Sequence, residues 1–211
     1  MGVFDDLNLF GDWIQVVDEQ NPLTIENYGY DTGVVEGTTG NHCVKCVAVN
    51  ECWFKNEKGK KPEKASITGL QIIDKILNGL TPGLYHPYCH CEERPIETPS
   101  EETIQLIIPP GKIDYMFSDK GDWIKAMGYY EPNNSLFIKT LLQKTKLSYS
   151  HGNYYIVNHT KYGCKINLNV DIPGINEKEG KIYKLKTNYM VFPNGKLKMN
   201  TPIGGWQEWN Y

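Results

Sequence analysis

The feature that most constrains this chain is a pair of cysteine-rich segments separated by a long interval. Cys43 and Cys46 form a C-x-x-C pair, and a C-x-C pair, Cys89 and Cys91, follows shortly after His86. A C-x-x-C turn directs two thiolates at one ion, and an extended C-x-C segment points both side chains the same way. A site built from both segments would hold a region with little core of its own.

This spacing predicts a structural zinc site. The predicted Zn²⁺ ligands are Cys43, Cys46, Cys89 and Cys91, with His86 as the first substitute. Four such ligands complete the tetrahedral coordination of Zn²⁺ and leave no open position, so the site is structural rather than catalytic. Whether the fourth ligand is a cysteine or a histidine stays open, and the alternative is a set of ordinary buried thiols.

Two absences in the sequence limit where these cysteines act. The chain has 211 residues and no run of 18 apolar residues, so we expect no membrane span and no membrane partner. Its first residues are acidic and lack the basic segment of a secretory signal. We therefore expect a reducing compartment, where six cysteines indicate metal ligands or free thiols before disulfides.

Charge is distributed unevenly along the chain. Residues 1–40 carry eight acidic and no basic residues, whereas residues 112–211 carry eight acidic residues and fourteen lysines. The segment between them has nine acidic and eight basic residues, so the three parts contribute −8, −1 and +6 to the net charge of −3. A basic half of this kind favours an anionic ligand.

The pattern predicts an α+β chain with two parts. Residues 1–95 form the acidic segment and zinc-stapled module, residues 96–111 a proline-rich linker, and residues 112–211 an α+β domain with two helices and a four-stranded antiparallel sheet. Helices are expected over 7–17, 67–80, 123–127 and 134–141, and a short strand over 104–108. The expected sheet strands are 154–157, 165–170, 181–192 and 196–199, with a hairpin turn at 193–195.

The C-terminal part holds the residue types that a metal-independent ribonuclease needs. His151 and His159 are the residues of a type that can serve acid–base chemistry near neutral pH, and lysines such as Lys165 and Lys186 can hold a phosphate. A basic sheet with aromatic side chains also suits single-stranded RNA. The ordinary alternative is a solvated lysine face, a histidine in a surface turn and aromatic residues in the core.

Two family resemblances bear on the predicted zinc site and on the predicted ribonuclease chemistry. The segments Cys43–Cys46, Cys52–Phe54 and Gly83–Cys91 resemble the cysteine-rich module of minor head, or head-morphogenesis, proteins of Mu-type tailed phages. The resemblance covers roughly residues 40–95, and the larger N-terminal part of such proteins is absent. It implies a phage or prophage protein found in the virion or in the host bacterial cytoplasm.

Residues 104–205 are similar to an uncharacterised C-terminal domain of phage minor head proteins and polymorphic toxins, assigned to the barnase–EndoU–colicin–RelE ribonucleases. That similarity implies that His151 is the general acid or base and that Tyr154 orients it or the substrate. The residues implied to hold the phosphate are Thr187 and Thr201 through hydrogen bonds and Lys186 or Lys198 through charge. Where such domains carry Arg before the final Thr, this chain has Lys198, which cannot form a bidentate fork.

The leading hypothesis is therefore a phage-associated effector with a structural zinc site and a toxin-like ribonuclease domain. The alternative is a non-enzymatic phage protein, either a minor virion component or an inhibitor that binds a host defence factor through its acidic first forty residues. A zinc-dependent nucleic-acid-binding module is a third possibility.

Overall fold

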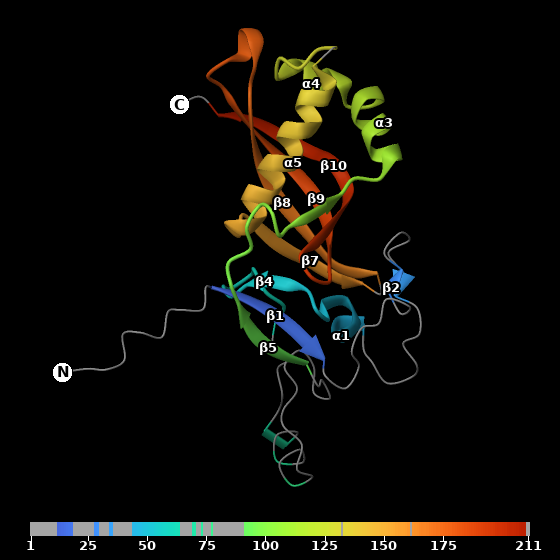
Figure 1. The fold of residues 1–211 in the computed structure, drawn as a ribbon, viewed down its shortest axis with the longest axis vertical. Coiled ribbons are helices and arrows are strands. Elements are labelled where there is room, and N and C mark those ends of the chain that lie inside the picture. The colour runs from blue at the N-terminus through green and yellow to red at the C-terminus, as the bar shows by residue number, and fades with distance from the viewer. Residues whose placement is uncertain are drawn as a thin grey trace, which may run out of the picture. The chain divides into compact units, whose positions relative to one another are not determined.

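The chain forms two structural units within an α+β fold (Figure 1). The computed structural model describes residues 12–18, 28–29, 34–35, 44–63, 69–70, 73, 77, 91–131, 133–160 and 162–209. The N-terminal unit comprises residues 1–98, 158–164 and 191–194, and the C-terminal unit comprises residues 99–157, 165–190 and 195–211. The first crossing between units, at Thr98–Pro99, lies inside the segment predicted as a linker.

A three-stranded sheet organises the N-terminal unit. Its central strand β1 (Trp13–Asp18) pairs antiparallel with β4 (Trp53–Lys55) and with β5 (Cys91–Ile96). The helix α1 (Val44–Val49) precedes β4, and β2 (Tyr28–Gly29) pairs antiparallel with β3 (Val34–Val35). Buried Trp13, Val16 and Phe54 form part of the core.

The predicted helix over residues 7–17 is wrong where the structure describes it. Residues 13–18 form a strand, because partners on both sides satisfy their backbone groups. The β-branched Ile14, Val16 and Val17 also favour extended backbone. Of the predicted helix over 67–80, the structure describes residues 69, 70, 73 and 77, all helical.

A five-stranded sheet organises the C-terminal unit, in the order β6-β10-β9-β8-β7. Its strands are β6 (Gln105–Ile107), β7 (Tyr154–Thr160), β8 (Gly163–Pro173), β9 (Ile182–Phe192) and β10 (Lys196–Trp209). The strands β7, β8, β9 and β10 follow one another through the short connections 161–162, 174–181 and 193–195. Neighbouring strands joined by such short connections run antiparallel, as predicted. The predicted four strands are thus present, but β6 adds a fifth that runs parallel to β10.

Three helices accompany this sheet: α3 (Pro110–Ser118), α4 (Gly121–Ala126) and α5 (Asn134–Ser150). Two of them, α4 and α5, were predicted, whereas α3 was not predicted and its first two residues lie within the predicted linker of residues 96–111. Helix α5 lies against one face of the sheet (Figure 1), where Thr145 and Tyr189 share a buried hydrogen bond of 3.0 Å between their hydroxyl oxygens. In the part of the chain that is described, no helix is long and apolar enough to cross a membrane.

Candidate functional site

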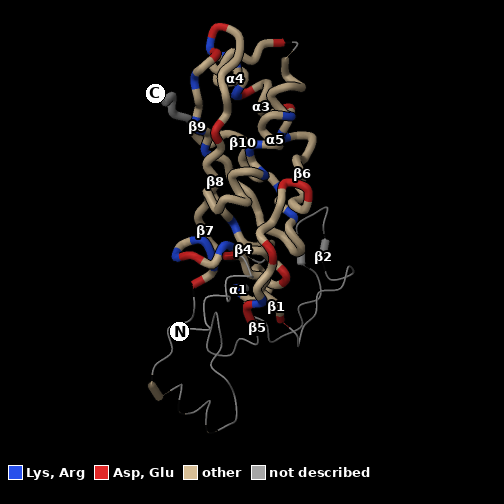
Figure 2. The backbone as a smooth tube through the Cα atoms, turned by 60° about the vertical axis from the view of Figure 1, so that its left-hand side comes forward, with Lys and Arg blue, Asp and Glu red and all other residues tan. Residues whose placement is uncertain are grey.

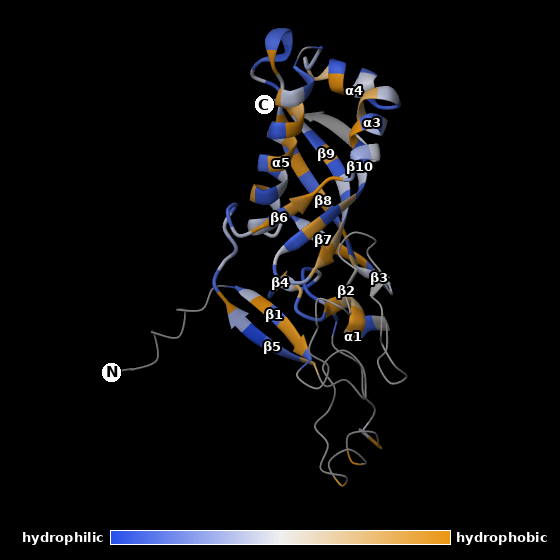
Figure 3. Ribbon diagram, turned by 45° about the vertical axis from the view of Figure 1, so that its right-hand side comes forward, coloured by the Kyte–Doolittle hydropathy of each residue, from blue (hydrophilic) through white to orange (hydrophobic). Residues whose placement is uncertain are grey.

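Hydrophilic and hydrophobic residues alternate along the strands of the C-terminal sheet (Figure 3). On β8, buried Ile166, Leu168 and Val170 alternate with the less buried Lys165 and Asn167. Because strand side chains alternate between faces, the apolar set faces α5 and the polar set the opposite side. We call these the helix face and the polar face, the latter defined by Lys165, Asn167, Lys186 and Asn188.

A row of side-chain hydrogen bonds crosses the polar face from β10 to β7. Asn200 Nδ2 donates to Asn188 Oδ1 at 3.2 Å, and Asn188 Nδ2 donates to Asn167 Oδ1 at 2.8 Å. Asn167 Nδ2 in turn donates to the phenol oxygen of Tyr155 at 2.8 Å. Asn188 Nδ2 also donates to the carbonyl oxygen of Ile166 at 2.8 Å, which anchors the row to the backbone. These bonds hold four side chains from four strands in fixed positions.

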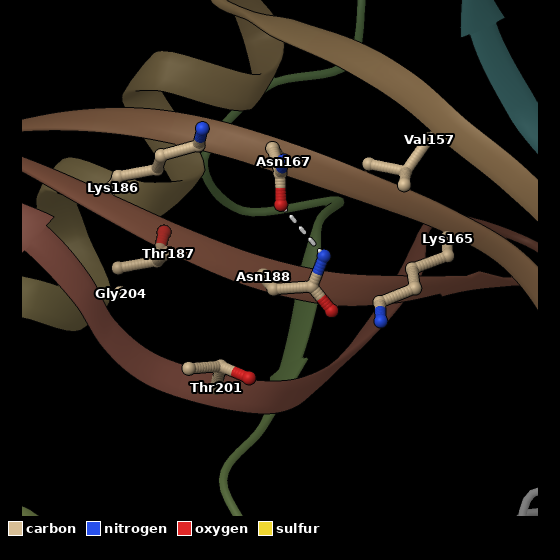
Figure 4. Close-up of a pocket in the computed structure, with 8 residues that line it drawn as sticks. All are labelled: Val157, Lys165, Asn167, Lys186, Thr187, Asn188, Thr201 and Gly204. Carbon is tan, nitrogen blue, oxygen red and sulfur yellow. Dashed lines mark hydrogen bonds between the residues drawn. The ribbon is translucent and has the colours of Figure 1, made fainter.

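A pocket of ≈ 280 Å³ lies on this face. The residues that line it are Val157, Lys165, Asn167, Lys186, Thr187, Asn188, Thr201 and Gly204 (Figure 4). Its charged lining residues are both lysines, and the rest of its polar lining is neutral amide and hydroxyl. Such a lining favours an anion that also accepts hydrogen bonds.

Tyr155 borders this pocket through two of the lining residues. Its phenol oxygen accepts the hydrogen bond from Asn167, and Lys186 Nζ lies 5.5 Å from the centre of its ring. The ring is 38% exposed. Hydrogen bonding from the Lys186 ammonium lowers the pKa of Tyr155, and the bond from Asn167 lowers it further, because both favour the phenolate.

More lysines follow the same strands (Figure 2). Lys196 and Lys198 alternate with buried Leu197 and Met199 on β10, which places both lysines on the polar face. Lys184 on β9 lies 3.9 Å from Asp171 of β8, measured from Nζ to Oδ1. The polar face is therefore predominantly basic.

Four residues predicted from the sequence line the pocket together. Lys165, Lys186 and Thr201 come from β8, β9 and β10 and were expected to hold a phosphate, and Thr187 is the fourth. The Thr187 hydroxyl, however, donates to the carbonyl oxygen of Leu168 at 3.1 Å, and the residue is only 1% exposed. The Thr187 hydroxyl proton is therefore already bonded to the backbone, whereas the side chain of Thr201 is exposed.

The other three predicted catalytic residues are not among the lining residues. His151 caps the C-terminus of α5, where its backbone N–H donates to Leu147. Tyr154 is 1% exposed and packs against Tyr149 with ring centres 5.1 Å apart, so it belongs to the core. Lys198 is on the polar face outside the pocket. The residues that line the pocket thus include two predicted lysines and Thr201 but not His151.

His159, the second histidine considered, belongs to the N-terminal unit. Burial lowers its pKa, and the neighbouring Lys45 lowers it further while Glu63 opposes the shift. A neutral, half-buried imidazole is a poor proton donor to a ligand. The structure therefore assigns neither histidine to the pocket.

Two of the predicted zinc ligands fall within the described residues. Cys46 on α1 is 2% exposed, and Cys91, 7% exposed, begins β5 opposite Asp18. The backbone N–H of Asp18 donates to Asn50 Oδ1 at 2.9 Å, and the N–H of Asn50 donates to the carbonyl oxygen of Cys46. These contacts bring segments 45 residues apart in the chain to the same end of β1.

The remaining predicted ligands, Cys43, His86 and Cys89, lie outside the described residues. Within the described part of the chain, no group of three or more His, Cys, Asp or Glu side chains is placed to hold a metal ion. The zinc site therefore stays a prediction.

Cys52 and Cys164 behave as buried structural thiols. Both are fully buried, and burial raises the pKa of each thiol. Cys52 Sγ lies 3.6 Å from the carbonyl oxygens of Ala48 and Val191, either of which can accept its S–H. Metal binding and nucleophilic attack both need the thiolate. We therefore do not expect Cys52 or Cys164 to act as a metal ligand or a nucleophile.

The residues that sequence reasoning missed are the amides. Asn167 and Asn188 form the middle of the pocket wall (Figure 4), and Tyr155 is fixed by them. Their signal was the alternation Lys165-Ile166-Asn167-Leu168 on one strand and a similar Lys-x-Asn spacing, 186 to 188, on the next. Matching polar positions on adjacent strands predict a shared polar face.

No protein-family model, no curated protein and no solved structure matches this chain.

Proposed function

We propose that the C-terminal unit binds single-stranded RNA on the polar face of its sheet and cleaves it without a catalytic metal ion. The observation that carries this proposal is the pocket in which Lys165 and Lys186 flank hydrogen-bonding amides and the Thr201 hydroxyl. Lysines neutralise the charge that builds on a phosphate during cleavage, and fixed donors stabilise its oxygens.

RNA is favoured over a small free anion because the basic surface continues beyond the pocket. Lys184, Lys196 and Lys198 extend the positive charge along β9 and β10. Tyr155 and Val157, 38% and 45% exposed, offer apolar surface for an unstacked base. A lysine-lined groove with an aromatic platform is the common design of single-strand binding surfaces.

The direct test is incubation of the purified protein with fluorescent single-stranded RNA in buffer free of added divalent ions. We expect cleavage to products that end in a 2′,3′-cyclic phosphate, because without a metal the attacking group is the 2′-hydroxyl of the RNA itself. The same sequence with 2′-O-methyl groups should bind and stay intact. Wild-type protein that leaves RNA intact would overturn the enzymatic proposal.

A matched pair of variants ties cleavage to the pocket. Lys186→Ala should lower the cleavage rate about 10²-fold or more, as loss of one transition-state donor typically does. Lys139→Ala, which removes an exposed lysine of α5 outside this pocket, should keep the rate. Equal losses in both variants would show that general charge, rather than this site, drives the reaction.

We also propose that the N-terminal unit carries one structural Zn²⁺ held by Cys43, Cys46, Cys89 and Cys91, with His86 as the substitute. The support is the pattern of ligands along the chain together with the burial of Cys46 and Cys91 near one end of β1. Bound Zn²⁺ would cross-link the two cysteine segments, and such a metal contributes directly to folding.

Elemental analysis of the purified protein tests this site. One zinc per chain is expected, and Cys46→Ser or Cys91→Ser should each lower the zinc content well below that of Cys52→Ala. Cys52→Ala is the matched control because its thiol is also buried but is not a predicted ligand. Wild-type protein without zinc, prepared in zinc-containing medium, would contradict the proposal.

The phage association is proposed from the two resemblances in the sequence. The rival within the same setting is a non-enzymatic protein that binds a phage or host partner through residues 1–40, which carry −8. Capture of a stoichiometric protein partner by the wild-type chain, lost when the acidic residues of 1–40 other than the buried Asp18 are made neutral and accompanied by intact RNA, would favour that rival.

A further inference from the structure

We infer that Tyr155 is the general acid of the proposed cleavage and donates its phenol proton to the 5′-oxygen that leaves the phosphorus. This inference rests on the proposed ribonuclease function and adds the residue that moves the proton. It replaces His151, which the structure places at the end of α5 and not among the residues lining the pocket.

The first support is the hydrogen bonding of the phenol. Asn167 Nδ2 donates to the Tyr155 oxygen at 2.8 Å, and Asn167 is itself held by Asn188 at 2.8 Å. Because the phenol oxygen acts as acceptor toward Asn167, its own proton is directed elsewhere. The exposed ring lies beside Lys186, which lines the pocket, so that proton is available to a ligand there.

The second support is electrostatic. Once the proton has left, the phenolate is stabilised by the Lys186 ammonium and by the Asn167 amide, the same two groups that lower the pKa of Tyr155. A phenol whose pKa is lowered from its ordinary value is a stronger acid. The environment thus favours proton donation.

The proposed cleavage transfers the phenol proton of Tyr155 to the leaving 5′-oxygen. The 2′-oxygen attacks the phosphorus while its proton passes to water, and the bond from phosphorus to the 5′-oxygen breaks. The 5′-oxygen takes the proton of Tyr155, which gives a 2′,3′-cyclic phosphate and a free 5′-hydroxyl. The Tyr155 phenolate then regains a proton from water, and Lys165 and Lys186 neutralise the phosphate oxygens throughout.

Two substrates separate a general acid from a structural residue. A dinucleotide has a 5′-alkoxide leaving group that needs a proton, whereas uridine 3′-(p-nitrophenyl phosphate) releases p-nitrophenolate, which does not. Tyr155→Phe should lower kcat for the dinucleotide about 10²-fold or more and kcat for the p-nitrophenyl substrate less than about tenfold. Equal loss on both substrates would overturn the inference, because it would show a role in positioning alone.

Tyr115→Phe is the matched control for both substrates. Tyr115 lies on α3, is 37% exposed and does not line the pocket, whereas Tyr155 is 38% exposed. The control should cleave both substrates at the wild-type rate. A loss like that of Tyr155→Phe would show that removal of any exposed phenol perturbs the domain, and it would overturn the assignment.

A titration that needs no cleavage tests the same geometry. Tyrosinate absorbance is recorded against pH for wild type and Tyr155→Phe, and their difference reports Tyr155 alone. We expect this difference to titrate below the ordinary pKa of about 10 and to move upward in Lys186→Met. A difference curve at or above the ordinary value would overturn the inference.

The failures of the two proposals are distinguishable. If wild type cleaves neither substrate, the proposed function fails whatever the titration shows. If wild type cleaves the dinucleotide and Tyr155→Phe does so equally fast, the proposed function stands and the assignment of Tyr155 fails.

Discussion

The helix face and the polar face of the C-terminal sheet are made by the same strands, yet they differ in almost every property. On the helix face Leu168, Val170 and Leu185 are fully buried. On the polar face Lys165 and Asn167 are only partly buried and Lys186 is exposed. The comparison teaches that the packed core and the candidate site lie on opposite sides of one sheet, so substitutions on the two faces should have separable effects.

The largest expected effect lies on the helix face. Leu185→Ala should lower the free energy of unfolding by about 2–5 kcal/mol, because it removes a buried side chain and leaves a cavity. Its neighbour Lys184→Ala, on the polar face, should change it by about 0.5 kcal/mol or less, since its ion pair with Asp171 is exposed. Urea unfolding followed by circular dichroism measures both, and equal losses would break the distinction between the faces.

A pH-dependent effect also belongs to the helix face. Burial raises the pKa of Tyr189 from 10.0 to about 12. Between pH 10 and pH 12 the folded state therefore keeps a proton that the unfolded chain releases. The contribution of neutral Tyr189 to the free energy of unfolding is complete below about pH 10 and is lost between pH 10 and pH 12. The loss is about 3 kcal/mol at 1.36 kcal/mol per pH unit.

Tyr189→Phe isolates this contribution. The variant should be less stable than wild type at pH 8, because Thr145 loses its hydrogen-bond partner at 3.0 Å. It should then lose less stability than wild type as the pH rises above 10. Urea midpoints measured at several pH values give the difference, and parallel curves would contradict a buried, neutral Tyr189.

The smallest effect on stability and the clearest effect on binding belong to the polar face. The double variant Lys165→Ala, Lys186→Ala should leave the free energy of unfolding within about 0.5 kcal/mol of wild type. The slope of log affinity for single-stranded RNA against log salt should fall in magnitude by about 1.4, since each lost phosphate contact removes about 0.7. Fluorescence anisotropy at four salt concentrations measures it, and an unchanged slope would show that RNA binds elsewhere.

Local sequence signals predicted most of the C-terminal fold and misread two elements. The alternation of residues in β8 and β9 and the turn at 193–195 were sufficient to predict the antiparallel strands, because neighbouring residues specify strands that a hairpin connects. Strand β1 was misread as a helix because its partners β4 and β5 are far away in the sequence. The start of α3 was taken for a linker, although Pro110 at a first helical position is favourable.

The candidate site could be predicted only in part. Lys165 and Lys186 were expected because lysine suits a phosphate, and Thr201 because the family resemblance implied it; the strands bring all three to one pocket. Asn167 and Asn188 could not be singled out, since an amide gains its role only from the cross-strand bonds around it. Histidine was favoured as a residue type suited to acid–base chemistry, and the residue type says nothing about the place of His151 at a helix end.

The most direct test of the central claim, that the polar face is the RNA site, is NMR on ¹⁵N-labelled protein titrated with a short 2′-O-methyl RNA. We expect the side-chain amide signals of Asn167 and Asn188 and the backbone signals of Lys186 and Thr201 to shift in step with binding. Backbone signals of helix α5 should stay in place. Shifts confined to α5 or to the N-terminal unit, with Asn167 and Asn188 unchanged, would contradict the account.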